Sequence, residues 1–103
     1  MPEPNTPPTD QTPRKDLFHE YFFAAVTRTI LNPNHDLVQR MLVSHLEGLL
    51  ARTKPDKLTD AAVSGFISFV KSRNWADRLQ RKEIIQEYCS LSGENPGDYY
   101  YYV

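Results

Sequence analysis

Residues 59–91, TDAAVSGFISFVKSRNWADRLQRKEIIQEYCSL, decide how this chain folds. The first half of this stretch places apolar residues at i, i+3, i+4 and i+7, the spacing of one helix face, at Val63, Phe66, Ile67 and Val70. Thr59 stands just before them, and its hydroxyl can accept a hydrogen bond from a free backbone N–H of the first turn. We therefore expect a helix that begins after Thr59 and faces the core.

A second apolar stripe follows the break at Asn74-Trp75 and predicts another helix. Its members are Leu79, Ile84, Ile85, Tyr88 and Leu91. Gly93 stands where a glycine commonly closes a helix. Cys89 falls on the inner side of this helix, where a buried thiol is chemically inert.

Residues 71–82 lie between the two stripes and hold five cations together with the only tryptophan: Lys71, Arg73, Trp75, Arg78, Arg81 and Lys82. One interpretation is a nucleic-acid or partner contact, in which the cations neutralise phosphates and Trp75 stacks on a base. Arg78 and Lys82 are four residues apart and share a helix face. The other interpretation is a solvated helix face beside a core tryptophan.

The N-terminal half predicts a tail followed by two helices. Residues 1–15 are rich in proline and poor in large apolar residues, so we expect a disordered tail. Apolar residues that include Phe22, Val26 and Ile30 predict a helix from about Asp16, its expected N-cap, to Leu31. Residues 35–52 predict a second helix, capped by Asn34 and joined to the first as an antiparallel hairpin.

The C-terminal residues 94–103 form an acidic, tyrosine-rich tail after the last helix. Four consecutive tyrosines occupy it: Tyr99, Tyr100, Tyr101 and Tyr102. Tyrosine combines an apolar ring with a polar tip, which suits an interface. One or two of these rings either fold back onto the helices or dock on a partner.

These elements predict an all-α protein with one compact four-helix domain over residues 16–93, packed as a bundle or orthogonally. A domain of this size is marginally stable alone, so a protein partner or self-association is expected. The predicted core is Phe22, Val26, Leu42, Leu46, Leu49, Phe66, Ile67, Val70 and Leu79.

The patterns of several function classes are missing from the sequence. Metal ligands are not spaced for a site, because one cysteine and the histidines His19, His35 and His45 show no pairing. His45 fits a hydrogen-bonded histidine in the core or at its rim. No glycine-rich phosphate loop or nucleophile motif occurs. We therefore expect no enzyme activity and no cofactor. The lack of long apolar runs and of a disulfide framework favours a cytoplasmic protein without membrane contact.

Charge is segregated along the chain, although its net charge is −1. Residues 52–82 hold eight Lys or Arg against three acids, and residues 83–103 hold four acids and no Lys or Arg. Such asymmetry concerns partners rather than fold. The leading hypothesis is a non-enzymatic protein-interaction module, a subunit or adaptor of a larger assembly. The alternative is a nucleic-acid-contacting subunit that uses residues 71–82.

In format, a short helical bundle with a basic segment, the chain resembles the small all-helical subunits of RNA-guided CRISPR effector complexes. The resemblance implies a helical fold and nucleic-acid contact inside a larger complex. It rests on this combination of a bundle and the basic residues 71–82, and no sequence motif is shared.

Overall fold

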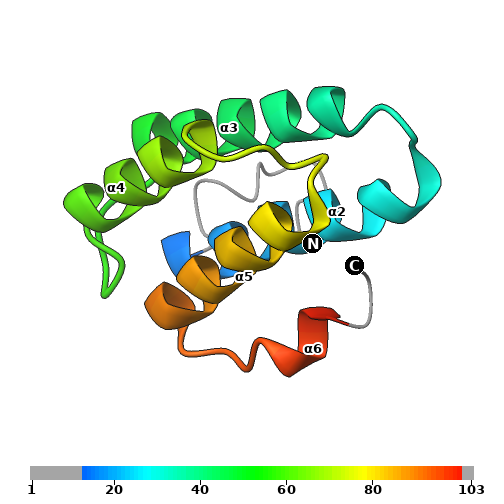
Figure 1. The fold of residues 1–103 in the computed structure, drawn as a ribbon. Helices are drawn as coiled ribbons and strands as arrows, with labels where there is room; N and C mark the ends of the chain where they lie inside the picture. Colours follow the sequence, from blue (N-terminus) through cyan, green and yellow to red (C-terminus); the bar gives the residue numbers. More distant parts are fainter. Residues whose placement is uncertain (1–12, 101–103) are drawn as a thin grey trace, which may run out of the picture.

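Four helices of 12 to 18 residues and one short helical turn build the protein in this computed structural model, which describes residues 13–100 (Figure 1). They are α2 (Arg14–Leu31), α3 (His35–Arg52), α4 (Asp60–Lys71), α5 (Arg78–Ser92) and α6 (Gly97–Tyr100). The described residues contain no strand. The all-α four-helix prediction is therefore confirmed, while residues 1–12 of the expected tail lie outside the described range.

The helices α2 and α3 form the expected antiparallel hairpin (Figure 1). Asn34 caps α3, because its side-chain oxygen accepts a hydrogen bond from the Leu37 backbone N–H at 3.1 Å. The Asn32 side chain in turn accepts from the Asn34 backbone N–H at 2.9 Å, which tightens the connection. The predicted bounds of α3 and its cap are confirmed.

The start of α2 differs from the prediction. The helix begins at Arg14 with Pro13 as its N-cap residue, so Asp16 lies inside the first turn and does not cap. The reason is Arg14, which is 2% exposed and belongs to the domain. Its guanidinium donates to the Thr53 side chain and backbone, to the Leu58 carbonyl and to Asp60 at 2.6–3.2 Å. These bonds fasten the first turn of α2 to the loop between α3 and α4.

The caps of α4 and α5 follow the local sequence. Thr59 accepts from the Ala62 backbone N–H at 3.1 Å, as predicted. Asp77 caps α5 by accepting from the Leu79 backbone N–H at 2.9 Å. Gly93 ends α5 with a φ of 79°, in the left-handed region that glycine adopts without strain, which confirms its predicted place.

Aromatic rings fill the centre of the core. Phe22 stacks on Tyr88 with ring centroids 3.9 Å apart, and Phe18 meets Phe66 edge to face at 5.4 Å. Every residue of the predicted core is buried except Leu79, which is 69% exposed. That prediction was wrong because Leu79 and Arg81 are two residues apart and so lie about 200° apart around the helix. Arg81 faces inward, and Leu79 therefore faces outward.

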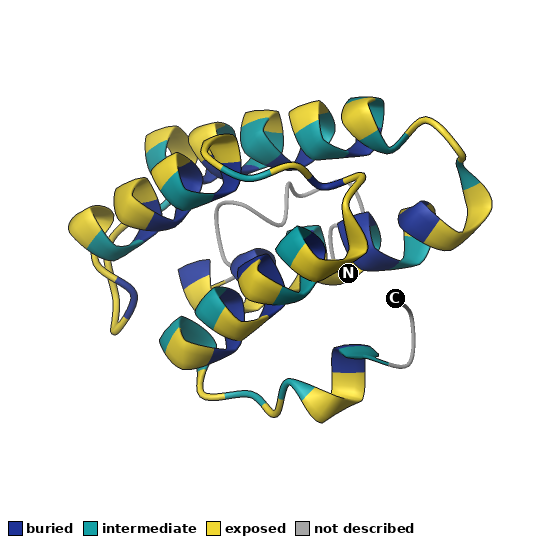
Figure 2. Ribbon diagram, viewed as in Figure 1, coloured by how far each residue is buried: buried dark blue, intermediate teal, exposed yellow. Residues whose placement is uncertain are grey.

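The helices α2 and α5 run antiparallel and present one common face to α6. Tyr88 near the end of α5 packs on Phe22, while Trp75, just before α5, reaches Thr29 near the end of α2. The short helix α6 lies over part of this face (Figure 1). Its Tyr99 is buried. Buried and exposed residues alternate along both helices (Figure 2).

Candidate functional site

Trp75 lies in the core and not on the basic surface. It is fully buried, and its indole N–H donates to the Thr29 hydroxyl at 2.6 Å. Gln39 holds the same loop, since its side-chain oxygen accepts from the Trp75 backbone N–H and its amide donates to the Arg73 carbonyl. The hypothesis that Trp75 stacks on a base is therefore wrong for this structure, because the ring has no exposed face.

Arg81, expected to contact a partner, is likewise turned inward and is 7% exposed. Its guanidinium donates to the Trp75 carbonyl at 2.6 Å, while its Nε atom is buried without a hydrogen-bond partner among the described residues. Burial and the nearby Arg78 lower the pKa of Arg81. The role of Arg81 in this structure is to hold the Trp75 loop against the start of α5.

Three of the remaining cations are engaged within the chain. Lys71 pairs with Glu47 at 3.3 Å, and Arg73 pairs with Glu83 at 2.7 Å. The Lys82 ammonium lies 5.3 Å from the ring centroid of Tyr100 and is half-buried. Arg78 is exposed. The structure therefore does not bring the six residues predicted at 71–82 together as one exposed surface.

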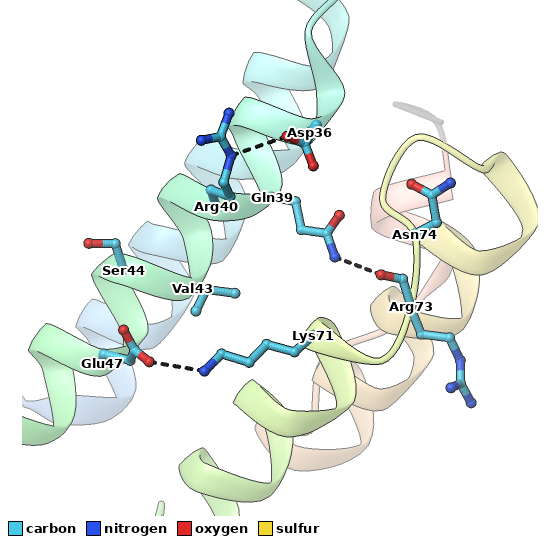
Figure 3. A pocket seen from close by; sticks show the side chains of 9 residues that line it. All are labelled: Asp36, Gln39, Arg40, Val43, Ser44, Glu47, Lys71, Arg73 and Asn74. Carbon is cyan, nitrogen blue, oxygen red and sulfur yellow. Dashed lines mark hydrogen bonds and ion pairs between the residues drawn. The ribbon is translucent and has the colours of Figure 1, made fainter.

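A cleft of about 490 Å³ lies between α3 and the end of α4 (Figure 3). Its walls come from Asp36, Gln39, Arg40, Val43, Ser44, Glu47, Lys71, Arg73 and Asn74. Arg40 bridges to Asp36 at 3.1 Å and Lys71 to Glu47, so charges of opposite sign face each other across and along the cleft. These exposed pairs contribute little to stability and leave the cleft without a dominant charge.

The first tyrosine of the tail is part of a hydrogen-bonded cluster on α2, α5 and the segment before α6. Glu94 accepts hydrogen bonds from the hydroxyls of Tyr88, at 2.5 Å, and Tyr99. The His19 Nδ1 atom lies 3.0 Å from the same carboxylate. This confirms that a tyrosine of the tail folds back onto the helices, at Tyr99; Tyr101 and Tyr102 lie outside the described residues.

Ionisation in this cluster is set by burial and hydrogen bonding. Burial disfavours the charged form of Glu94, but the bonds from Tyr88, Tyr99 and His19 outweigh it and lower the pKa of Glu94. Burial and the bond to Glu94 raise the pKa of both Tyr88 and Tyr99 above their usual range. The cluster therefore holds one carboxylate and two neutral phenols at neutral pH.

The sequence alone could not reveal the cluster. Glu94 lies beyond the end of α5, and only the left-handed turn at Gly93 brings its carboxylate back to Tyr88. His19 comes from the other end of the chain. The adjacent Glu20 is not its partner, as expected, because neighbouring side chains on a helix diverge.

Two other side chains named in the sequence analysis, Cys89 and His45, pack within the fold. Cys89 is buried, and burial raises the pKa of its thiol to about 11, so the thiolate that acts as nucleophile is scarce at neutral pH. His45 is half-buried and stacks on Tyr21 at 5.1 Å, so its place at the edge of the core is one of the two predicted. Burial together with Arg28 lowers the pKa of His45. Within residues 13–100, no group of three metal-ligating side chains is close enough to hold an ion.

The α2–α5 face is defined by the positions that α6 touches and by their continuation along the two helices. On α2 these are His19, Phe23 and Ile30; on α5 they are Leu79, Lys82 and Gln86. Tyr99 packs on Phe23 at 6.4 Å, and the Tyr100 hydroxyl accepts a hydrogen bond from Gln86 at 2.8 Å.

Helix periodicity extends this face beyond α6. Ile30 follows Phe23 by seven residues, and Leu79 precedes Gln86 by seven, so each pair shares a side of its helix. Because α2 and α5 are antiparallel, Ile30 and Leu79 both belong to the end of the face near Trp75. We call the part under Tyr99 the covered end and the part with Ile30 and Leu79 the open end.

The open end is apolar and solvent-exposed. Ile30 is 58% exposed and Leu79 is 69% exposed. Ile30 was expected to share an inner face with Phe22 and Val26, but it lies about 100° around the helix from the buried Thr29 and faces solvent. A signal for Leu79 was present in the sequence, since an inward stripe through Ile84, Ile85 and Tyr88 returns at position 81 and not at 79.

Comparison with known proteins gives no relative for this chain: no protein family, no curated protein and no solved structure matches it. None of the helices formed by residues 13–100 has the length and apolar character needed to cross a membrane.

Proposed function

We propose that the protein is a non-enzymatic interaction module that binds another protein and serves as a subunit or adaptor of a larger assembly. The observation that carries the proposal is the open end of the α2–α5 face. Single exposed apolar residues are normal on protein surfaces. Helix periodicity places Ile30 and Leu79 on the sides of α2 and α5 that pack against α6 further along, and exposed apolar surface that is contiguous marks interaction sites.

The polar clusters support a binding role over catalysis. The Glu94 carboxylate is occupied by two tyrosine hydroxyls, and the Cys89 thiol is buried with a raised pKa. The cleft beside α3 is lined by cations and acids that pair with each other. Each of these groups already has a structural partner or lies out of reach of a substrate, whereas a catalytic group needs an accessible reacting atom.

Nucleic-acid contact is the second candidate, and the pair Arg78 and Lys82 favours it. They lie four residues apart on one side of α5, and Arg78 is exposed. With two phosphate contacts, binding should weaken with salt at a log–log slope of roughly −1.4 to −1.8. Trp75 fluorescence should stay unchanged, because the ring is buried. A salt series with single-stranded RNA and DNA tests this candidate, and a slope near zero removes it.

Affinity purification with matched variants tests the leading proposal. The tagged 103-residue chain is expressed in its native host as wild type, as Leu79→Asp and as Ala61→Asp, which adds the same charge at an exposed position of α4. We expect wild type and Ala61→Asp to recover the same partner in stoichiometric amounts and Leu79→Asp to lose it while its circular dichroism melt is unchanged. Equal recovery by all three variants would contradict the proposal.

A further inference from the structure

We infer that the open end of the α2–α5 face takes an acidic amphipathic segment of a partner protein, with apolar side chains on Ile30 and Leu79 and carboxylates toward Arg78 and Lys82. This inference rests on the proposed function and names the chemistry of the partner. Two observations carry it: the charges around the open end, and the segment that already lies on the covered end.

The charge around the open end is positive. Arg78 and Lys82 flank Leu79 on α5, and no acid lies in the first turn of that helix. The acids nearest in sequence are directed elsewhere: Asp77 accepts from the Leu79 backbone and the Gln80 amide, and Glu83 pairs with Arg73. An apolar surface bordered by cations complements apolar anchors bordered by carboxylates.

The covered end shows what this face accepts. Its occupant, residues 94–100, is acidic and aromatic. Tyr99 supplies the buried anchor, at 2% exposure, and Glu94 supplies the carboxylate beside His19. The Tyr100 ring lies against the Lys82 ammonium, so this cation already contacts the present occupant at the boundary between the two ends. A partner segment of the same chemistry would continue along the face toward Leu79.

Two designed helical peptides serve as the probe. Both carry leucines at i, i+3, i+4 and i+7; the remaining positions are mainly glutamate in one and mainly lysine in the other. They are titrated into the 103-residue chain while the methyl resonances of Ile30 and Leu79 are followed by NMR. We expect the acidic peptide to shift these two sets of resonances and to bind about tenfold tighter than the basic peptide, an advantage that shrinks as salt rises.

Reversing the charge of single residues distinguishes recognition at the open end from nonspecific electrostatic attraction to the whole protein. Arg78→Glu should lower the affinity for the acidic peptide by about three- to tenfold and raise the affinity for the basic peptide. Arg40→Glu, an exposed cation on α3 outside the face, should change neither. Equal affinity for both peptides, or shifts that avoid Ile30 and Leu79, would overturn the inference.

The other possible occupants give distinct results, and each also overturns the inference. If a second copy occupies the open end, the methyl shifts change with protein concentration alone. If residues 101–103 of the same chain occupy it, a chain that stops at Tyr100 shows changed shifts without peptide. In one outcome the two peptides bind equally well, but Leu79→Asp still abolishes partner recovery. The proposed function then stands, and only the acidic character of the partner is removed.

Discussion

The covered end and the open end of the α2–α5 face are built by the same two helices but differ in what lies against them. At the covered end Tyr99 is 2% exposed, whereas at the open end Leu79 is 69% exposed. Residues 94–100 follow directly on α5, so only a short loop is needed to order them over the covered end. Among residues 13–100 no segment shields Ile30 and Leu79 to the same degree. We propose from this difference that the covered end contributes to stability and that the open end serves recognition.

The largest expected effect comes from a substitution that creates a cavity beneath the covered end. Phe22→Ala removes a fully buried ring that stacks on Tyr88 and should destabilise the domain by about 3–5 kcal/mol. That loss approaches the whole stability of a small domain. Urea unfolding followed by circular dichroism measures it. Ile30→Ala on the same helix should cost less than about 1 kcal/mol. Similar losses for the two variants would break the division.

A smaller effect is expected at the polar contacts of the covered end. Glu94→Gln removes the charge that accepts from Tyr88 and Tyr99 and should cost about 1–3 kcal/mol at pH 7. Leu79 and Ile30 should keep their resonances in this variant, which NMR of the methyl groups checks.

The same variant has a defined pH dependence. Because the folded pKa of Glu94 lies below its unfolded value of about 4.3, its ionisation stabilises the fold above that pH. The contribution is lost as pH falls through the folded pKa. The difference between wild type and Glu94→Gln in urea midpoint should therefore shrink between pH 7 and pH 3. A difference that stays constant would show that Glu94 is not held as a carboxylate.

The smallest effect on stability is expected at the open end. Leu79→Ser should change the free energy of unfolding by no more than about 0.5 kcal/mol, because the leucine is already mostly in water. Thermal melts of the two proteins, measured in parallel, test this. A loss of several kcal/mol would mean that Leu79 belongs to the core after all.

Local sequence signals predicted most of the fold. Asn34, Thr59 and Gly93 act at single helix ends through bonds or backbone angles that depend only on neighbouring residues, and their roles were readable from sequence. The start of α2 was not readable, because Arg14 is fixed by Thr53, just after α3, and by Asp60, the first residue of α4. The proline-rich context predicted a tail through residue 15, whereas these long-range hydrogen bonds place Arg14 within the folded domain.

The candidate site was less predictable, since helix orientation decides which side chains are exposed. The cluster of cations at 71–82 suggested a single surface, but Trp75 and Arg81 turn inward and Leu79 turns outward. That rotation of α5 follows from packing of Ile84, Ile85 and Tyr88 against the core. The acidic tail predicted an interface in general terms, yet the bonds between Tyr99, Glu94 and His19 depend on the tertiary fold.

Site-specific photocrosslinking tests the claim that the open end is the contact surface most directly. A benzophenone amino acid replaces Leu79 in one form of the 103-residue chain and Ala61 in another, and both are irradiated in the native host. We predict one discrete adduct with another protein from position 79 and none from position 61. Adducts of equal yield from both positions, or an adduct from position 61 alone, would contradict the account.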